Sequence, residues 1–288
     1  MKIIPLAFDS MGVRSTATFV ETDLKILIDP GVSLGALRYG LPPSVKEIEK
    51  LEKLSEVVGD YAKISDILTI SHYHYDHYFP QATFYKDKIL LMKDPKNNIN
   101  SSQRQRASEF LDWLKNHPGT KEFADGKSFK FKNTEIDFSP AVPHGAKGSK
   151  LGFVLMCSIS YEMKKFIHAT DVQGPQNEEA TNWIIDQNPD ILLLSGFPTL
   201  FLGYKASKKS MEESHRNLIK IMTETKVHTI ILDHHLVRDL KYPDKILPIL
   251  ESARKLQKKI LNAAEFLGIP SEFLEAKRKE LYQTDAVE

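Results

Sequence analysis

The chain has 288 residues, 41% hydrophobic and 27% charged, with a formal net charge of +1 and one cysteine, Cys157. This balance is ordinary for a globular protein, and it excludes both an internal disulfide and an overall basic field that would recruit nucleic acid. No apolar stretch approaches the roughly 20 residues of a membrane-spanning helix, and the first residues are too short an apolar run for a secretion signal. We therefore expect a cytoplasmic protein without a membrane partner, with Cys157 as a small core residue.

The first half of the chain is predicted to be rich in strands. Alternating β-branched residues indicate strands at 16–21 and 25–28, the second ending at Asp29-Pro30-Gly31. Ser44 and Glu47 form a capping box for a helix with apolar residues at helical spacing from Ile48 to Val58. Further elements are expected as strands at 66–71, 88–92, within 126–140, 151–160 and 165–170, and as a helix at 101–116.

Beyond Asp171 the pattern alternates between helices and strands. The predicted elements are a helix at about 176–187, a strand at 190–194, a helix capped by Ser210 and Glu213, a strand at 229–232, and terminal helices from about 242. Strands dominate the first part of the chain, and strands alternate with helices in the second part. This pattern predicts a layered α/β architecture, although the sheet order does not follow from it. No repeat or flexible linker interrupts the chain, so we expect residues 1–288 to form one domain.

The segment His72-Tyr73-His74-Tyr75-Asp76-His77 constrains function more tightly than any other. Three imidazoles and a carboxylate follow directly after an apolar strand, and such ligands suit zinc, iron or manganese. One metal cannot easily take four ligands from so short a segment. Two neighbouring metals can, if His72 and His74 serve one and Asp76 and His77 the other. The alternative is a surface loop that happens to be rich in histidine.

Four further candidates lie just past the ends of predicted strands, namely Asp29, His144, Asp171 and His234. In open α/β sheets, ligands collect at the carboxyl ends of strands. A single histidine in such a place is usually structural. Together with the 72–77 segment, however, these residues indicate a preorganised site for two metals.

The order of these residues resembles the metallo-β-lactamase superfamily. The likeness rests on His72-x-His74-x-Asp76-His77, on the later His144, Asp171 and His234, and on Ile28-Asp29-Pro30-Gly31, and it spans about residues 6–236. It implies a four-layer αββα sandwich with two metals at one edge. Gly12-Val13-Arg14-Ser15 and residues 38–43 resemble a largely archaeal branch, for which no particular substrate is implied.

The resemblance also implies roles for individual residues. His72, His74 and His144 would bind one metal, Asp76, His77 and His234 would bind the other, and Asp171 would bridge them. Asp29 would hold the ligand loop by hydrogen bonds. His235 is the rival of His234 as the last ligand. His168 is expected to be structural.

Two such metals predict hydrolysis, because a water shared between them becomes a hydroxide near neutral pH, and Asp76 is placed to orient it. We expect two divalent ions, zinc before iron or manganese, and a small ester, lactone or phosphoester as substrate. His74 argues against redox diiron members, which carry Glu in the position of the second histidine. A phosphodiesterase or nuclease acting on RNA or DNA, and a metal-binding protein without turnover, are the alternatives.

Two loops are candidates for the walls of the substrate pocket. Residues 31–43, which include Arg38, and residues 195–204 each follow a strand at the edge that carries the site. Their aromatic and apolar residues suit a modest organic ligand better than a polyanion. The alternative is that these residues only pack the loops onto the sandwich. The oligomeric state cannot be read from the pattern.

Overall fold

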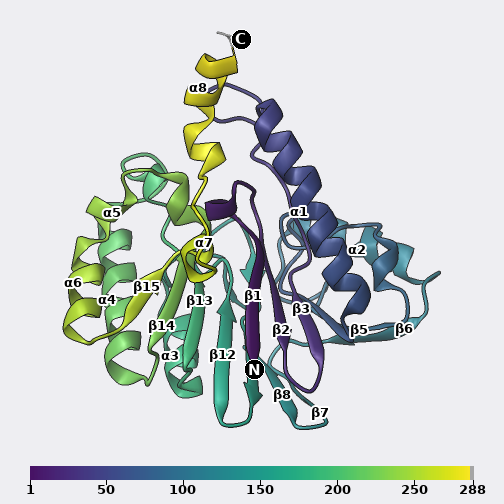
Figure 1. The fold of residues 1–288 in the computed structure, drawn as a ribbon. Coiled ribbons are helices and arrows are strands. Elements are labelled where there is room, and N and C mark those ends of the chain that lie inside the picture. Colours follow the sequence, from purple (N-terminus) through teal and green to yellow (C-terminus); the bar gives the residue numbers. More distant parts are fainter. Residues whose placement is uncertain (286–288) are drawn as a thin grey trace.

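The computed structural model describes residues 1–285 and places two β-sheets face to face between outer helices (Figure 1). The first sheet has the strand order β1-β2-β3-β4-β5-β6. Its strands are β1 (Lys2–Phe8), β2 (Thr16–Glu21), β3 (Lys25–Ile28), β4 (Ile67–Ile70), β5 (Lys88–Met92) and β6 (Gly119–Phe123). Strands β3 to β6 are parallel, so their carboxyl ends meet at one edge.

The second sheet has the order β15-β14-β13-β12-β11-β8-β7, and its strands β12 to β15 are also parallel. A separate short hairpin pairs β9 with β10. The strands are β7 (Ser128–Phe131), β8 (Thr134–Phe138), β9 (Val142–Pro143), β10 (Phe153–Val154), β11 (Cys157–Tyr161), β12 (Lys164–Ala169), β13 (Ile191–Ser195), β14 (Thr229–Asp233) and β15 (Lys259–Leu261).

Helices form the two outer layers. Helices α1 and α2 bury apolar residues such as Val58 and Phe110 against the first sheet. Helices α3, α4 and α6 do the same on the second sheet, through residues such as Ile184 and Leu218. The helices are α1 (Val45–Ile64), α2 (Ser101–Leu114), α3 (Glu178–Gln187), α4 (Lys208–Glu224), α5 (Tyr242–Lys245), α6 (Leu247–Lys255), α7 (Ala263–Phe266) and α8 (Leu274–Asp285), with 3-10 turns η1 (Asp9–Met11), η2 (Thr83–Tyr85), η3 (Thr199–Phe201) and η4 (His234–Arg238).

A third apolar cluster fills the space between the sheets. It joins Val20 and Ile67 of the first sheet to Ile159, Phe166 and Leu193 of the second. Burying one face of each sheet against the other and the second face against helices gives four layers. The αββα sandwich is therefore confirmed. Cys157 lies buried on β11 with a free thiol, as expected for a core residue.

Four strands were not predicted: β1, β6 and β15, which lie at sheet edges, and the two-residue β9 of the separate hairpin. Strand β6 is mostly exposed and β15 has only three residues, so neither shows a clear alternation of buried and polar positions. Strand β1 is interrupted in its pairing register between Pro5 and Ala7. An edge strand has one pairing neighbour, so its sequence carries a weaker pattern than that of a central strand.

Smaller differences have local causes. Helix α4 begins at Lys208, because the side chain of Ser207 rather than Ser210 accepts the capping hydrogen bond. The predicted strand 151–160 is broken at Leu155, whose backbone N–H donates to Ser71 O in the loop that follows β4. Ile48, the first residue of the predicted apolar face of α1, is 44% exposed. The neighbouring Glu47 is the buried residue in this turn.

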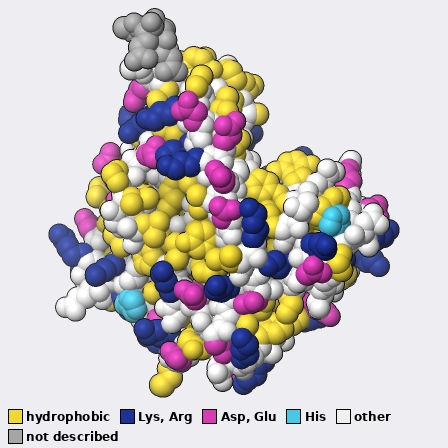
Figure 2. Space-filling model, turned by 45° about the vertical axis from the view of Figure 1, so that its right-hand side comes forward, with side chains coloured by type: hydrophobic (Ala, Val, Ile, Leu, Met, Phe, Trp, Pro, Cys, Tyr) yellow, Lys and Arg dark blue, Asp and Glu magenta, His cyan; other side chains and the backbone are white. Residues whose placement is uncertain are grey.

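The outer surface carries both signs of charge. Figure 2 shows Lys and Arg side chains interspersed with Asp and Glu over the face that it displays. Helix α8 stands above the body of the molecule beside the start of α1 (Figure 1). Every helix of residues 1–285 is too short or too polar to span a lipid bilayer.

Candidate metal centre

The ligand loop begins where β4 ends and is tightly anchored. Its backbone turns at the hydrogen bond from His77 N to His74 O, 2.9 Å long. Tyr73 points into the core and donates its hydroxyl to Lys93 O at 2.6 Å. Gly31 lies against the same loop, where an added Cβ would be 2.1 Å from Tyr78 N. Of the two tyrosines in this turn, Tyr73 is buried in the core and Tyr75 is exposed, while the imidazoles between and beside them lie at the sheet edge.

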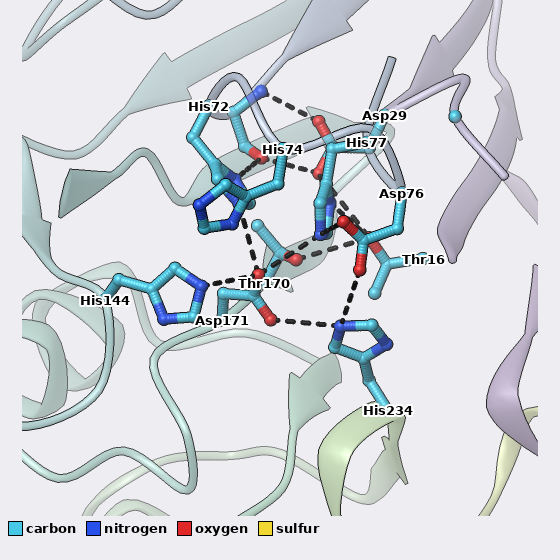
Figure 3. A network of polar contacts seen from close by, with 12 residues as sticks. Thr16, Asp29, His72, His74, Asp76, His77, His144, Thr170, Asp171 and His234 are labelled. Atoms are coloured by element: carbon cyan, nitrogen blue, oxygen red, sulfur yellow. Dashed lines mark hydrogen bonds and ion pairs between the residues drawn. The ribbon is translucent and has the colours of Figure 1, made fainter. Parts of the chain in front are cut away.

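One group of ligand atoms gathers around Asp171 Oδ2, the carboxylate that follows β12 (Figure 3). His72 Nε2 lies 3.2 Å from this oxygen and His144 Nε2 lies 3.0 Å from it. His74 completes the group, with its Nδ1 3.0 Å from His72 Nε2. The ligand atoms of these four residues all lie within 4.8 Å of one another.

A second group lies beside the first and contains Asp76, His77 and His234. His77 Nε2 is 3.1 Å from Asp171 Oδ2, and His234 Nε2 is 3.2 Å from Asp171 Oδ1. Asp171 therefore faces both groups with its two oxygens (Figure 3). The structure brings together all seven residues that the sequence predicts as ligands, which we call the ligand cluster: His72, His74, Asp76, His77, His144, Asp171 and His234.

The Asp29 carboxylate lies beside the ligand cluster and hydrogen-bonds to His77 and Ser71. It accepts from His77 Nδ1 at 2.9 Å and from the Ser71 hydroxyl at 2.6 Å. Ser71 Oγ in turn lies 2.9 Å from His72 Nδ1. One buried carboxylate thereby orients two imidazoles, which is the usual arrangement behind metal-binding histidines.

Asp9 gives His234 the same support, and this residue was missed in the sequence. Its Oδ2 lies 2.5 Å from His234 Nδ1, and its other oxygen accepts from Arg238 Nε. Burial would lower the pKa of His234, but the Asp9 carboxylate raises it to about 9. Asp9 directly follows β1, and a carboxylate at a strand end is the signal that would have identified it. Because β1 was not predicted, this signal was not recognised.

Burial and charge set the protonation of the cluster. Burial, reinforced by neighbouring imidazoles, lowers the pKa of His72 to about 4 and that of His74 to about 2. Burial would raise the pKa of Asp171, but the surrounding histidines hold it well below its usual range. Burial would also lower the pKa of His77 and His234, but neighbouring carboxylates raise it, so a metal that binds these two imidazoles must displace their protons.

The ligand cluster fits a metal rather than a hydrogen-bonded network. His77 Nδ1 faces Asp29, while its buried Nε2 makes no hydrogen bond to any of residues 1–285. That atom instead points toward Asp171, and Asp76 Oδ1 lies 3.8 Å away. A cation among these nitrogen and oxygen atoms would give the lone pair of Nε2 its partner. The donor set suits zinc, iron or manganese.

The backbone is strained at three strand ends in this site. Asp29, Asp171 and His234 have φ values of 50°, 51° and 44°, in the left-handed region that L-residues seldom adopt. Each of the three turns its side chain into the site or its support. Such conformations persist only where the surrounding structure enforces them, and they concentrate at functional sites.

The remaining sequence candidates lie at the rim or outside. His235 Nε2 is 3.0 Å from Asp171 Oδ1, so it groups with His234 around that oxygen. His168 is buried and its Nε2 lies 2.8 Å from Thr16 O, in keeping with a structural role. Arg38 and His235 both line a cavity of about 570 Å³. Both predicted wall loops contribute to this cavity.

Comparisons with known proteins agree with this picture. No family model matches the chain. A UPF0282 protein of Methanopyrus kandleri is 42% identical over 295 residues, covering 98% of this chain and 99% of the relative. A UPF0282 protein of Thermococcus gammatolerans is 46% identical over 299 residues, covering 99% and 96%. Among solved structures, the CmlA β-hydroxylase E377D mutant matches with a TM-score of 0.50 at 11% identity, covering 87% of this chain and 51% of that one. That likeness concerns the fold alone.

Proposed function

Because this chain belongs to the UPF0282 family and has the fold of the metallo-β-lactamase superfamily, we propose that it is a metal-dependent hydrolase of a small ester, lactone or phosphoester. The largely archaeal branch predicted from the sequence is the one that its relatives represent. The hydrolysed bond and the metal are part of the proposal, as is the cytoplasmic location.

The observation that carries the proposal is the position of Asp171 between two groups of ligand atoms at an accessible edge. The Asp76 side chain is 18% exposed and that of His235 is 14% exposed. His74 is half-buried, whereas the other imidazoles of the ligand cluster are almost fully buried. His235 also lines the cavity of about 570 Å³, which therefore adjoins the ligand cluster. A purely structural metal site is normally closed by four protein ligands, whereas this one faces space for a substrate.

We assign the ligands as the sequence predicts. His72, His74 and His144 would hold one ion, Asp76, His77 and His234 would hold the other, and Asp171 would be shared by the two. Three side chains and a bridge for each ion leave room for water and substrate. Two divalent ions, zinc by preference, would supply acidification of a water and polarisation of the substrate oxygen. Asp76, the most exposed carboxylate of the ligand cluster, is placed to orient the attacking water by a hydrogen bond.

The modest size of the cavity and a net charge of only +1 favour a small molecule over RNA or DNA. A nuclease needs a basic surface that follows a phosphate backbone. The phosphodiesterase alternative and the alternative of metal binding without turnover are separated by the following experiment.

The test is metal analysis of the purified protein together with a substrate screen. We expect about two metal ions per chain, and turnover of p-nitrophenyl esters, lactones or bis-p-nitrophenyl phosphate that falls at least 100-fold in Asp76→Ala. His117→Ala, which removes an imidazole stacked on Trp113 outside the site, is the matched control and should leave turnover unchanged. Full metal loading without turnover of any probe would favour the non-catalytic alternative, and cleavage of oligonucleotides alone would favour the nuclease.

A further inference from the structure

The cavity beside the ligand cluster is unusually basic. Four of its lining side chains are Arg14, Arg38, Lys205 and Arg238, against one carboxylate, Glu275. The whole chain carries a net charge of only +1. Positive charge is therefore concentrated at this cavity, and a concave site focuses such a field.

Two of these cations are already neutralised. Arg14 donates from both Nε and Nη2 to the Glu275 carboxylate, each at 2.6 Å. Arg238 pairs with Asp9 behind the ligand cluster. Arg38 and Lys205, by contrast, have no carboxylate oxygen within 4.0 Å among residues 1–285. The excess charge of the cavity thus resides on Arg38 and Lys205.

Arg38 is held in place with one donor unsatisfied. Its Nη2 donates to Arg238 O at 2.9 Å and to the Tyr39 hydroxyl at 3.1 Å, and its guanidinium lies 4.4 Å from the centre of the Tyr39 ring. Its Nε is buried and has no hydrogen-bond partner in the part of the chain that the structure describes. An oxyanion is the acceptor that a guanidinium prefers, and Arg38 lines the cavity in which one would bind.

The loop that carries Arg38 is rigid. Arg38 and Leu41 exchange backbone hydrogen bonds of 2.9 and 3.0 Å around Tyr39 and Gly40, both with positive φ. Helix α8 fastens this turn, because Arg278 donates to Leu41 O at 3.0 Å and the Tyr39 hydroxyl donates to Ala276 O at 3.1 Å. A donor fixed in this way binds a ligand without the cost of ordering a mobile loop.

Arg38 is linked to the ligand cluster through two side chains, Arg238 and His235. Arg238, whose carbonyl holds Arg38, has its Nη1 3.2 Å from His235 Nδ1. The other ring nitrogen of His235 reaches Asp171 at 3.0 Å. Along this path the Arg238 side chain and the His235 ring both lie between Arg38 and Asp171, so a group bound at Arg38 is not the bond under attack at the ligand cluster. Apolar Leu37, Leu200 and Phe201 line the same cavity.

We propose that the substrate carries an oxyanion distinct from the bond that is hydrolysed, a phosphate or a carboxylate, and that Arg38 binds it with Lys205 as the second cation. The apolar wall would accept the carbon chain that joins the oxyanion to the scissile ester. This inference rests on the proposed hydrolase function for its kinetic test, but its binding test is independent of turnover.

The kinetic test compares two esters of equal leaving group, p-nitrophenyl butyrate and mono-p-nitrophenyl succinate, on the metal-loaded protein. We expect the charged ester to have the higher kcat/KM. Arg38→Gln should raise KM for the charged ester about tenfold, with a similar kcat, and leave the neutral ester unchanged. Lys164→Gln, which removes an exposed lysine at the opposite end of β12, is the charge-matched control.

The binding test uses calorimetry with inorganic phosphate and with succinate on the same proteins. The dissociation constant of at least one of them should rise about tenfold in Arg38→Gln and less in Lys205→Gln, and stay unchanged in Lys164→Gln. If Arg38→Gln weakens the binding of phosphate alone or of succinate alone, that result identifies the class of anion. Equal turnover of both esters, or anion binding that Arg38→Gln and Lys205→Gln leave unaltered, would overturn the inference. Absence of any turnover, with Arg38-dependent anion binding retained, would instead count against the hydrolase function only.

Discussion

At the scale of single residues, the ligand cluster is oriented by side chains that do not belong to it. Asp29 orients His77 directly and His72 through Ser71, and Asp9 orients His234. Gly31 allows the backbone of the ligand loop to pass where any side chain would collide. The motif Asp29-Pro30-Gly31 therefore has two functions, a carboxylate that supports and a glycine that makes room.

Removing the Asp29 carboxylate should weaken metal binding. In Asp29→Asn the two imidazoles lose their charged acceptor, and we expect metal affinity to fall about 10- to 100-fold. Competition with a chelating dye measures it. Asp112→Asn, on the exposed face of α2, serves as the control, and equal affinities in both variants would contradict the supporting role.

Gly31→Ala should disturb the ligand loop. The new Cβ would stand 2.1 Å from Tyr78 N and 2.4 Å from His77 C, and both are backbone atoms that cannot rotate away. We expect a loss of about 1–3 kcal/mol in the free energy of unfolding, together with weaker metal binding. Gly59→Ala, in the middle of α1 with nothing within 4 Å, should be neutral or stabilising. Denaturant titrations of both variants decide the matter, and a neutral Gly31→Ala would refute this account of the motif.

At the scale of elements, helix α8 links the end of the chain to the loop over the cavity. Arg278 is fully buried and forms a bidentate ion pair with Glu47, the residue that also closes the capping box of α1. The same guanidinium donates to Gly35 O and Leu41 O. One arginine thus ties α8, the start of α1 and the Arg38 loop together.

Breaking this ion pair on one side should be costly. Arg278→Met leaves Glu47 buried without its counter-charge, and we expect a loss of about 3–5 kcal/mol. Adding Glu47→Gln should recover part of this loss, because glutamine keeps the capping box and carries no charge. A double-mutant cycle in thermal or chemical unfolding measures the coupling. Additive losses would show that the two side chains act separately.

At the scale of the whole molecule, the ligand cluster joins the two halves of the sandwich. The ligand loop and Asp29 follow strands of the first sheet, whereas Asp171 and His234 follow strands of the second. A metal held by both sets would stabilise the contact between the sheets, since a ligand that binds only the folded state adds to its stability.

Removing the metal should therefore lower the unfolding temperature of the entire chain. At a metal concentration of about 100 times the Kd the expected contribution is about 2.7 kcal/mol, or roughly 5 °C in Tm for a chain of this size. Scanning calorimetry with and without chelator measures the shift, and a single transition would support one domain over residues 1–288. His77→Ala should show a smaller shift, and a chelator-independent Tm in the unmodified protein would argue against the metal centre.

The sequence by itself determined the types of the ligands, their order and the strands that carry most of them. These features are local: alternation within a strand, a cap at a helix, and a dense His-Asp segment each act over a few residues. The central strands and the seven predicted ligand positions followed from such patterns.

Only the tertiary structure decided which distant groups support and surround the site. Asp9 meets His234 across 225 positions of the chain and Arg278 meets Glu47 across 231, and no local pattern encodes such a meeting. The edge strands β1, β6 and β15 were missed for the same reason, since their pairing partner rather than their own alternation makes them strands. The cavity with the unpaired Arg38 also arises only when residues 31–43, the end of β14 and α8 are packed together.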